Sequence, residues 1–192
     1  MKLARHQKLQ RVASQRQAGF IVVLEDIHDP HNAAAILRTC DAFGVQDVWF
    51  IFNKEKAYNP RRVGKSSSSS ANKWLTFRIF KSVAECKAVL KRLRYESVGT
   101  VLRPGAEDFT KAKFNTKRIA LWVGNEHAGL SEQATEACDR LLMLPMKGFV
   151  ESLNVSVMTA ISMYEISRQR ASKVYLRNAQ DVTALAKDFL QR

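Results

Sequence analysis

Short apolar runs alternate with helical patterns along most of the chain, and this alternation constrains the fold more than any other feature. The runs at 20–24 (FIVVL) and 47–52 (DVWFIF) have the length and the branched, apolar composition of strands buried in a parallel sheet. Between them, Asp29 and Pro30 are suited to begin a helix and Gly44 is suited to end it. The pattern predicts an α/β fold with a mainly parallel sheet and helices on both faces.

The rest of the chain continues this alternation, except for residues 53–72. That stretch is polar and basic, and five serines at 66–70 make it low in complexity. It is either a passive linker or a mobile loop that closes on a ligand. General rules for chain connection predict a doubly wound sheet without a knot. Further strands are predicted at 74–80, 97–102, 119–123 and 141–144, and further helices after Ser82, after Ser131, from Ser152 to about Arg170, and at 178–191.

The charge of the chain favours a polyanionic partner. Lys and Arg number 31 against 18 Asp and Glu, which gives a formal net charge of +13. Such an excess is typical of nucleic-acid binding, while an anionic membrane or basicity without a partner are the alternatives. Residues 2–17 are basic and contain no acid, so they form either an RNA-contacting arm or a solvated helix.

The sequence gives no sign of a metal centre, a disulfide framework or a membrane segment. Cys40, Cys86 and Cys138 are widely spaced without a CxxC pair, and His31 and His127 have no partner at metal-ligand spacing. No run approaches the roughly 18 apolar residues of a membrane span, and the N-terminus has no apolar signal core. We therefore expect a cytoplasmic protein without a metal ion.

Three segments place polar residues where strands are predicted to end, which is the edge where parallel α/β sheets bind ligands. They are HNAAAILR (31–38), GNEHAGLS (124–131) and PMKGFVESLNVS (145–156). Each is a weak signal alone, because Arg38 would also suit a surface ion pair and Ser152 would also suit a helix cap. The second segment is neither a GxGxxG motif nor a P-loop, although its first glycine would let a ligand approach the backbone closely.

Taken together and in this order, the segments resemble the motifs of the TrmH-type SPOUT RNA 2′-O-methyltransferases. The resemblance covers roughly residues 20–170, and three ordered motifs are far more specific than any one of them. The matching residues are Asn32 and Arg38 in the first motif, Gly124, Glu126, Gly129 and Ser131 in the second, and Pro145, Met146, Gly148, Ser152, Leu153, Asn154 and Ser156 in the third.

The family resemblance implies a fold, a cofactor and a partner. It implies a sheet with a deep trefoil knot near the C-terminus in place of the unknotted sheet. The knot binds S-adenosylmethionine, and the protein forms a homodimer in which the partner completes each site. It also implies a basic N-terminal helical arm at 1–18, a SPOUT methyltransferase domain at 19–171 and a C-terminal helical extension at 172–192. The cofactor contacts that it implies are Thr100, Gly124, Asn125, Glu126, Leu144, Met146, Ser152 and Leu153.

The resemblance makes Arg38 the catalytic residue, supported by Asn32, Ser152 and Asn154. Because an arginine has a pKa above about 12, it does not lose its proton easily. Arg38 therefore acts either as a base assisted by the substrate phosphate, or as a clamp on the phosphate and the ribose oxygen. In the second case water or another group takes the proton.

The basic arm and the helical tail resemble, within the family, the tRNA enzymes that methylate the ribose of guanosine 18 in the D-loop. Wobble-position enzymes lack such arms, and ribosomal RNA members carry an N-terminal domain that about 20 residues cannot form. Another site in tRNA or ribosomal RNA, or a non-catalytic RNA-binding protein, are the alternatives. A dehydrogenase is disfavoured because no GxGxxG follows a strand.

The serine run at 66–70 stands where the family would lead us to expect a mixture of Gly and Ser. The conformation of this loop, and hence how it would bind the guanosine, is therefore left open. The predicted RNA contacts are Arg5, Lys8, Arg11, Arg61, Arg62, Lys65 and Lys73.

Overall fold

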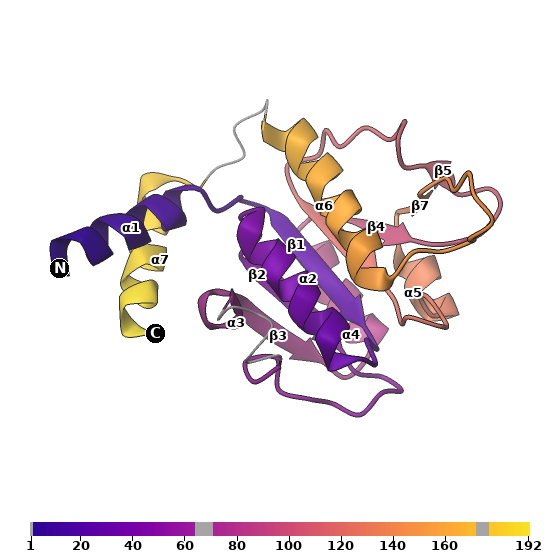
Figure 1. The fold of residues 1–192 in the computed structure, drawn as a ribbon, viewed down its shortest axis with the longest axis horizontal. Helices are drawn as coiled ribbons and strands as arrows, with labels where there is room; N and C mark the ends of the chain where they lie inside the picture. The colour runs from indigo at the N-terminus through magenta and orange to yellow at the C-terminus, as the bar shows by residue number, and fades with distance from the viewer. Residues whose placement is uncertain (1, 64–70, 172–176) are drawn as a thin grey trace.

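A computed structural model describes residues 2–63, 71–171 and 177–192 of the protein (Figure 1). Its seven strands form one sheet in the order β3-β2-β1-β6-β4-β7-β5, and every pair of neighbours is parallel. The α/β fold with a parallel sheet that the sequence predicts is confirmed. The strands are β1 (Phe20–Glu25), β2 (Asp47–Ile51), β3 (Thr76–Phe80), β4 (Glu96–Thr100), β5 (Glu107–Asp108), β6 (Ile119–Val123) and β7 (Arg140–Met143).

Helices occur where the sequence predicts them, with one short addition, α3, which begins within the 53–72 stretch. The run of serines at 66–70 and Lys65 lie outside the described residues. The helices are α1 (Lys2–Ser14), α2 (Pro30–Ala42), α3 (Ala71–Trp74), α4 (Val83–Arg92), α5 (Glu132–Ala137), α6 (Val155–Ala171) and α7 (Ala179–Gln191).

Helix ends follow from local sequence. The Asp29 side chain accepts a hydrogen bond from the first turn of α2 at 2.8 Å, Pro30 is the first helical residue, and Gly44 beyond the end adopts a φ of +72°. Ser82 and Ser131 cap α4 and α5 in the same way. Helices α2 and α4 thus begin shortly after β1 and β3, whereas residues 124–131 form a longer loop between β6 and α5.

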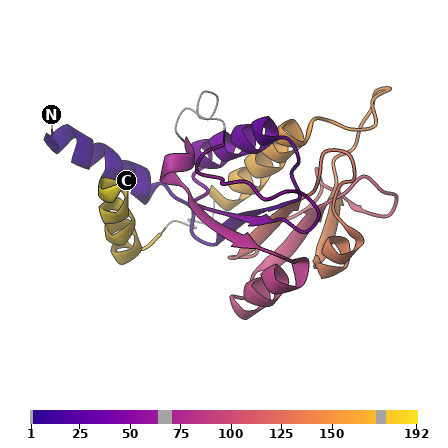
Figure 2. The same cartoon turned by 90° about the horizontal axis from the view of Figure 1, so that it is seen from below.

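The two faces of β1 explain why its sequence is apolar throughout. Phe20, Val22 and Leu24 belong to one core cluster, and Ile21 and Val23 belong to a second one on the other side of the sheet. Figure 2 shows α2 and α6 over one face of the sheet and α4 and α5 over the other. The central strands are thus buried on both sides, as parallel sheets require.

Besides Trp74, which was expected in a strand but ends α3, two details differ from the sequence-based expectation. The last long helix begins at Val155 and not at Ser152, because the Asn154 side chain accepts the amide of Ser156 at 2.8 Å and takes the capping position instead. A two-residue strand, β5, was not expected, since Glu107 and Asp108 are too few to produce an alternating pattern.

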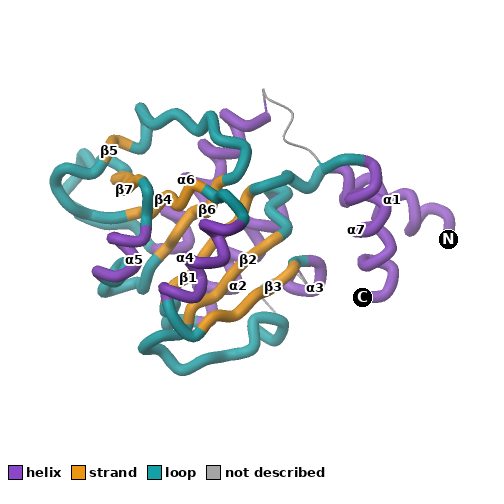
Figure 3. The backbone as a smooth tube through the Cα atoms, turned by 180° about the vertical axis from the view of Figure 1, so that it is seen from behind, coloured by secondary structure: helices purple, strands orange, loops and turns teal. Residues whose placement is uncertain are grey.

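The first and last helices lie together to one side of the sheet (Figure 3). Leu9 and Ala13 of α1 pack against Ala186 and Phe189 of α7 in a small separate cluster. The ring of Phe189 also meets Trp74 edge-on at 5.6 Å, which joins the helix pair to the domain. No helix among the residues described is long and apolar enough to span a membrane.

Candidate active site

A cavity of about 370 Å³ opens at the carboxyl ends of β4, β6 and β7. Three loops line it, one after β4, one after β6 and one that joins β7 to α6, together with Phe109, Leu142 of β7 and the first turns of α6. Every residue that the resemblance assigns to cofactor binding lines this cavity. These residues are Thr100, Gly124, Asn125, Glu126, Leu144, Met146, Ser152 and Leu153.

The loop after β6 folds back on itself beside the cavity. Asn125 and Gly129 exchange two backbone hydrogen bonds of 3.0 Å each. A Cβ atom on Gly124 would lie 2.1 Å from the carbonyl carbon of Gly129. The returning chain therefore requires a glycine here, and the expectation that this glycine also lets a ligand approach the backbone stays a prediction. Its neighbour Asn125 donates its side-chain amide to the carbonyl of Asp26 at 2.8 Å, which ties this loop to the end of β1.

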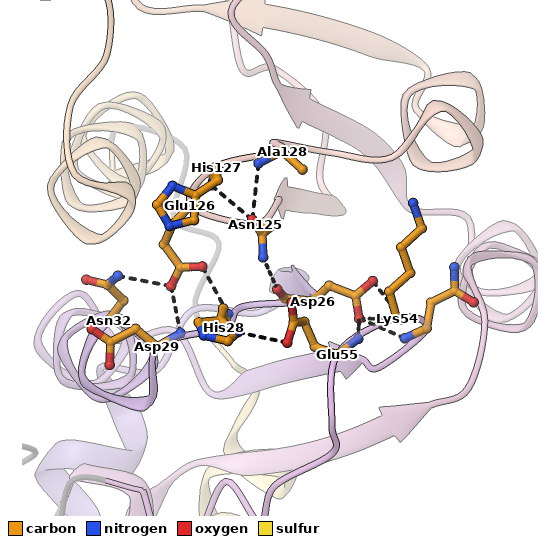
Figure 4. A network of polar contacts seen from close by, with 11 residues as sticks. Asp26, His28, Asp29, Asn32, Lys54, Glu55, Asn125, Glu126, His127 and Ala128 are labelled. Atoms are coloured by element: carbon orange, nitrogen blue, oxygen red, sulfur yellow. Dashed lines mark hydrogen bonds and ion pairs between the residues drawn. The ribbon is translucent and has the colours of Figure 1, made fainter.

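Glu126 connects the second motif to the start of α2 (Figure 4). Its carboxylate accepts the backbone amides of His28 at 3.0 Å and Asp29 at 3.1 Å, and the side-chain amide of Asn32 at 3.0 Å. Burial alone would raise the pKa of Glu126, but these hydrogen bonds outweigh it and lower the pKa. The carboxylate thus stays ionised and fixes the loop between β1 and α2.

The third motif joins the same network through Asn154. Its side-chain amide donates to the side-chain oxygen of Asn32 at 3.0 Å, and its own oxygen accepts the hydroxyl of Ser156 at 2.6 Å. Residues from all three motifs therefore form one hydrogen-bonded chain that runs from Glu126 through Asn32 to Asn154. Ser152 lines the cavity next to this chain.

Arg38 lies apart from the other three predicted catalytic residues. It is exposed on α2, does not line the cavity, and makes no hydrogen bond or ion pair with the described residues. Six residues separate it from Asn32, a rotation of roughly 240° around the helix, so the two side chains leave α2 on different sides. A single chain does not bring Arg38 to the cavity.

A clamp at the end of β1 escaped the sequence analysis. Asp26 has a φ of +49°, and its buried carboxylate accepts the amides of Asn53, Lys54 and Glu55, which follow β2. Glu55 in turn accepts a hydrogen bond from Nδ1 of His28 at 2.8 Å and thereby raises the pKa of His28. The polar residues that follow two neighbouring strands were the only available signal.

Comparison with known proteins decides the family. The sequence profile of the SpoU rRNA Methylase family matches residues 19–164. The chain belongs to the SpoU methylase family. A protein named tRNA (guanosine(18)-2′-O)-methyltransferase from Thermus thermophilus is 37% identical over 170 residues, which cover 87% of this chain and 84% of that protein.

Solved structures agree with this family assignment. The Aquifex aeolicus TrmH/SpoU tRNA modifying enzyme is similar with a TM-score of 0.88 at 28% identity, over 97% of this chain and 95% of the other. The SpoU methyltransferase AviRb from Streptomyces viridochromogenes, solved in complex with the cofactor AdoMet, is similar with a TM-score of 0.72 at 28% identity, over 82% and 60%.

The cavity of this SpoU family member suits S-adenosylmethionine chemically. Leu142, Leu144 and Met158 offer an apolar wall, while Thr100 and Glu126 add polar groups to the lining. Its size falls in the usual range of small-molecule sites, roughly 300–1,000 Å³. An ionised carboxylate at the rim also suits a positively charged sulfonium. No group of three His, Cys, Asp or Glu side chains that would hold a metal ion occurs in the described ranges.

The predicted RNA contacts of this SpoU family member all reach solvent where the structure describes them. Arg5, Lys8 and Arg11 are exposed on α1. Exposed Arg61 lies over the ring of Phe77 at 5.5 Å, next to exposed Arg62, and Lys73 lies over the ring of Trp74 at 5.1 Å. Asn72 fixes this region by donating to the carbonyls of Arg61 at 3.0 Å and Val63 at 3.1 Å.

Proposed function

We propose that the protein transfers the methyl group of S-adenosylmethionine to the ribose 2′-oxygen of guanosine 18 in tRNA. The observation that carries this proposal is the convergence of three distant motifs on one cavity and one hydrogen-bond network. The relative from Thermus thermophilus, whose name states this activity, supports the target nucleotide. A tRNA substrate also suits the net charge of +13.

The bound cofactor supplies an already activated methyl group, so the chain contributes alignment and proton removal. The eight cavity residues named above hold the cofactor in this proposal. Asn32, Ser152 and Asn154 position the ribose, and the hydrogen bonds between Asn32, Asn154 and Glu126 keep those side chains in place. Arg38 binds the phosphate next to the ribose and either takes the 2′-OH proton or holds the oxygen while water takes it.

We propose that two copies form a homodimer and that Arg38 serves the cavity of the partner. Val157, Ile161 and Tyr164 form a stripe on α6 and are 48%, 38% and 55% exposed, although large apolar side chains are usually covered. Phe149, in the loop that leads to α6, is fully exposed. The exposed stripe supports a second copy of the chain packed against α6. Analytical ultracentrifugation tests this: the wild-type chain should sediment as a dimer and the Ile161→Glu variant as a monomer.

The trefoil knot implied by the family stays part of the proposal. Strand β7 pairs with β4 on one side and with β5 on the other, and residues 101–106 join those two strands. Beyond β7, Gln169 of α6 bonds to the backbone of Ala112 and Phe114, which follow β5. This contact of β7 and α6 with the earlier segment supports the proposed knot.

The proposed organisation keeps an arm at 1–18, a methyltransferase domain at 19–171 and an extension at 172–192. The separate cluster between α1 and α7 supports treating the two ends as one RNA-binding appendage. A cytoplasmic location follows from the proposed substrate.

Methyl transfer from labelled S-adenosylmethionine to a tRNA transcript, with mapping of the modified nucleotide, tests the proposal. We expect label on the 2′-oxygen of guanosine 18, and none on a matched tRNA that carries 2′-deoxyguanosine there. Label at another nucleotide would keep the chemistry and reject the target. No label despite cofactor binding would favour a different RNA, whereas no cofactor binding would favour a non-catalytic RNA-binding protein.

A further inference from the structure

A group of exposed cations lies at the end of the sheet opposite the cavity. One of its two segments runs from the end of α4 into β4, and the other leads into β6. Both β4 and β6 begin there, so the group faces away from the carboxyl ends that form the site. We call it the amino-edge patch, and its residues are Lys91, Arg92, Arg94, Lys113, Lys117 and Arg118.

The two segments of the patch are held together by the fold. Arg118 donates from its guanidinium to the carbonyl of Leu93 at 2.5 Å and lies over the ring of Tyr95 at 5.9 Å. The amide of Glu96 bonds to the carbonyl of Arg118 at 2.9 Å. The charges therefore form one surface and are not scattered along the chain.

None of the six cations forms an ion pair with a described carboxylate, and the nearby acids have other partners. Glu96 binds Arg140 at 3.5 Å and also accepts the Thr116 hydroxyl, while Asp139 binds Lys87 at 3.0 Å. The helix dipole accounts for cations at the end of α4, but not for those before β6. The patch thus keeps a net positive charge that nothing within the described fold requires.

The patch continues toward the N-terminal arm. Ile119, directly after Arg118, donates its amide to the carbonyl of Gly19 at 2.8 Å, and Arg170 bonds to the carbonyls of both Ala18 and Thr116. Residue 18 is the last of the arm that carries Arg5, Lys8 and Arg11, and residue 19 directly follows it. The exposed cations of α1 and the amino-edge patch thus border the same edge of the sheet.

We propose that the amino-edge patch binds the phosphate backbone of the tRNA substrate, at a distance from the target nucleotide. This proposal rests on the proposed function and extends it to a second contact surface. Strands of five residues separate the two edges by only about 17 Å, which a folded RNA of several helical turns exceeds. Contacts to phosphate fix the orientation of the RNA without reading its sequence.

An RNA suits the patch better than an anionic membrane does. Peripheral membrane binding combines cations with apolar side chains that enter the bilayer. In the patch segments, Phe114 is buried and Leu93 is only 36% exposed, so little apolar surface is available. The surface offers charge alone, which is what a phosphate backbone recognises.

The test measures equilibrium binding of the full-length chain to a tRNA transcript at several KCl concentrations, without methyl transfer. The variant K91A/R92A/K113A/K117A removes four cations. Arg118 is kept because its side chain bonds to the carbonyl of Leu93, and Arg94 because its φ is +57°. We expect the Kd for tRNA to rise on the order of tenfold near 0.15 M salt and the salt dependence to fall by up to about three units of log–log slope. The affinity for S-adenosylmethionine should not change.

Two double variants distinguish the loss of charge from misfolding of the fourfold variant. K91A/K117A removes two patch cations and should show about half of the change in slope, while K56A/K81A removes two exposed cations outside the patch, the arm and the extension and should behave as wild type. Wild-type Kd and slope in the fourfold variant would overturn the proposal. So would unchanged tRNA binding combined with lost binding to phosphatidylglycerol vesicles, which would assign the patch to a membrane. Because no step requires catalysis, failure of the methylation assay would leave this test intact.

Discussion

The two edges of the sheet use charge in opposite ways. At the carboxyl edge, Glu126 and Asn32 satisfy their polar groups within the protein through short hydrogen bonds. At the amino edge, cations such as Lys91 and Lys117 stay in solvent without a carboxylate partner among the described residues. The first arrangement fixes geometry and tolerates little displacement, whereas the second acts over a distance that salt screens. A substitution should therefore change turnover or cofactor affinity at one edge, and the salt dependence of RNA binding at the other.

Arg38 is the residue most able to break this comparison, because it is exposed and unpaired among the described residues yet belongs to a site motif. We expect Arg38→Ala to lower kcat on the order of 100-fold or more while S-adenosylmethionine still binds, as measured by single-turnover methyl transfer and calorimetry. Arg38→Lys keeps the charge but not the planar fork, so it should rescue tRNA affinity more than kcat. If only KM rises in Arg38→Ala, Arg38 is a phosphate contact like those of the amino edge.

The substitution Gly124→Ala tests how closely the loop after β6 folds back on itself at the carboxyl edge. The extra methyl group of Gly124→Ala would lie 2.1 Å from the backbone of Gly129, whereas Gly148 has no heavy atom within 4 Å of the same position. We expect Gly124→Ala to lower the free energy of unfolding by about 1–3 kcal/mol or more and to abolish cofactor binding. Gly148→Ala is the matched control and should keep its melting temperature. Equal melting temperatures for both variants would contradict the close return of the loop.

Glu126 supplies a pH test of the same edge. Because its pKa is lowered in the folded state, its contribution to stability is present above the ordinary pKa of 4.5 and is lost as the pH falls through the lowered value. Glu126→Gln should lower the free energy of unfolding by about 1 kcal/mol at pH 7, since an amide cannot accept all three hydrogen bonds. Urea denaturation at pH 7 and pH 3 should show this difference mainly at the higher pH.

The smallest expected effect concerns the exposed pair of His28 and Glu55. The hydrogen bond and the charge of Glu55 raise the pKa of His28 above 6.5, so the pair stabilises below that pH and is lost as the pH rises through the raised pKa. Titration of the imidazole proton signal by NMR should show the pKa of His28 returning toward 6.5 in Glu55→Gln. An unchanged pKa of His28 in this variant would mean that the hydrogen bond between His28 and Glu55 does not persist in solution.

The fold was predictable from the sequence to the extent that its signals are local. The apolar run at β1, the caps Asp29 and Ser82 and the end at Gly44 all depend on neighbouring residues, and all are confirmed. Strand β5 was missed because its two residues are too few to form a local pattern, so only its pairing with β7 reveals it.

The site shows the same division between local and distant signals. Motif residues were found, but the close approach of Gly129 to Gly124 was not predicted, because it depends on how the loop after β6 folds back. The clamp made by Asp26 remained hidden, because its acceptor role depends on where residues 53–55 arrive after β2. The position of Arg38 on another side of α2 than Asn32 follows from helical geometry, but its consequence for a single chain needed the structure.

Asn72 links the two ends of the segment 64–70. It follows that segment in the chain, and its side-chain amide donates to the carbonyls of Arg61 and Val63, which precede it. Both ends of that segment are anchored by bonds that do not depend on what lies between them. For folding stability, a longer segment between the same two anchors would therefore cost little, because each doubling of a loop's length adds only about 0.6 kcal/mol. The same independence makes the segment a suitable place to insert a fluorescent peptide or a crosslinker without disturbing the cavity.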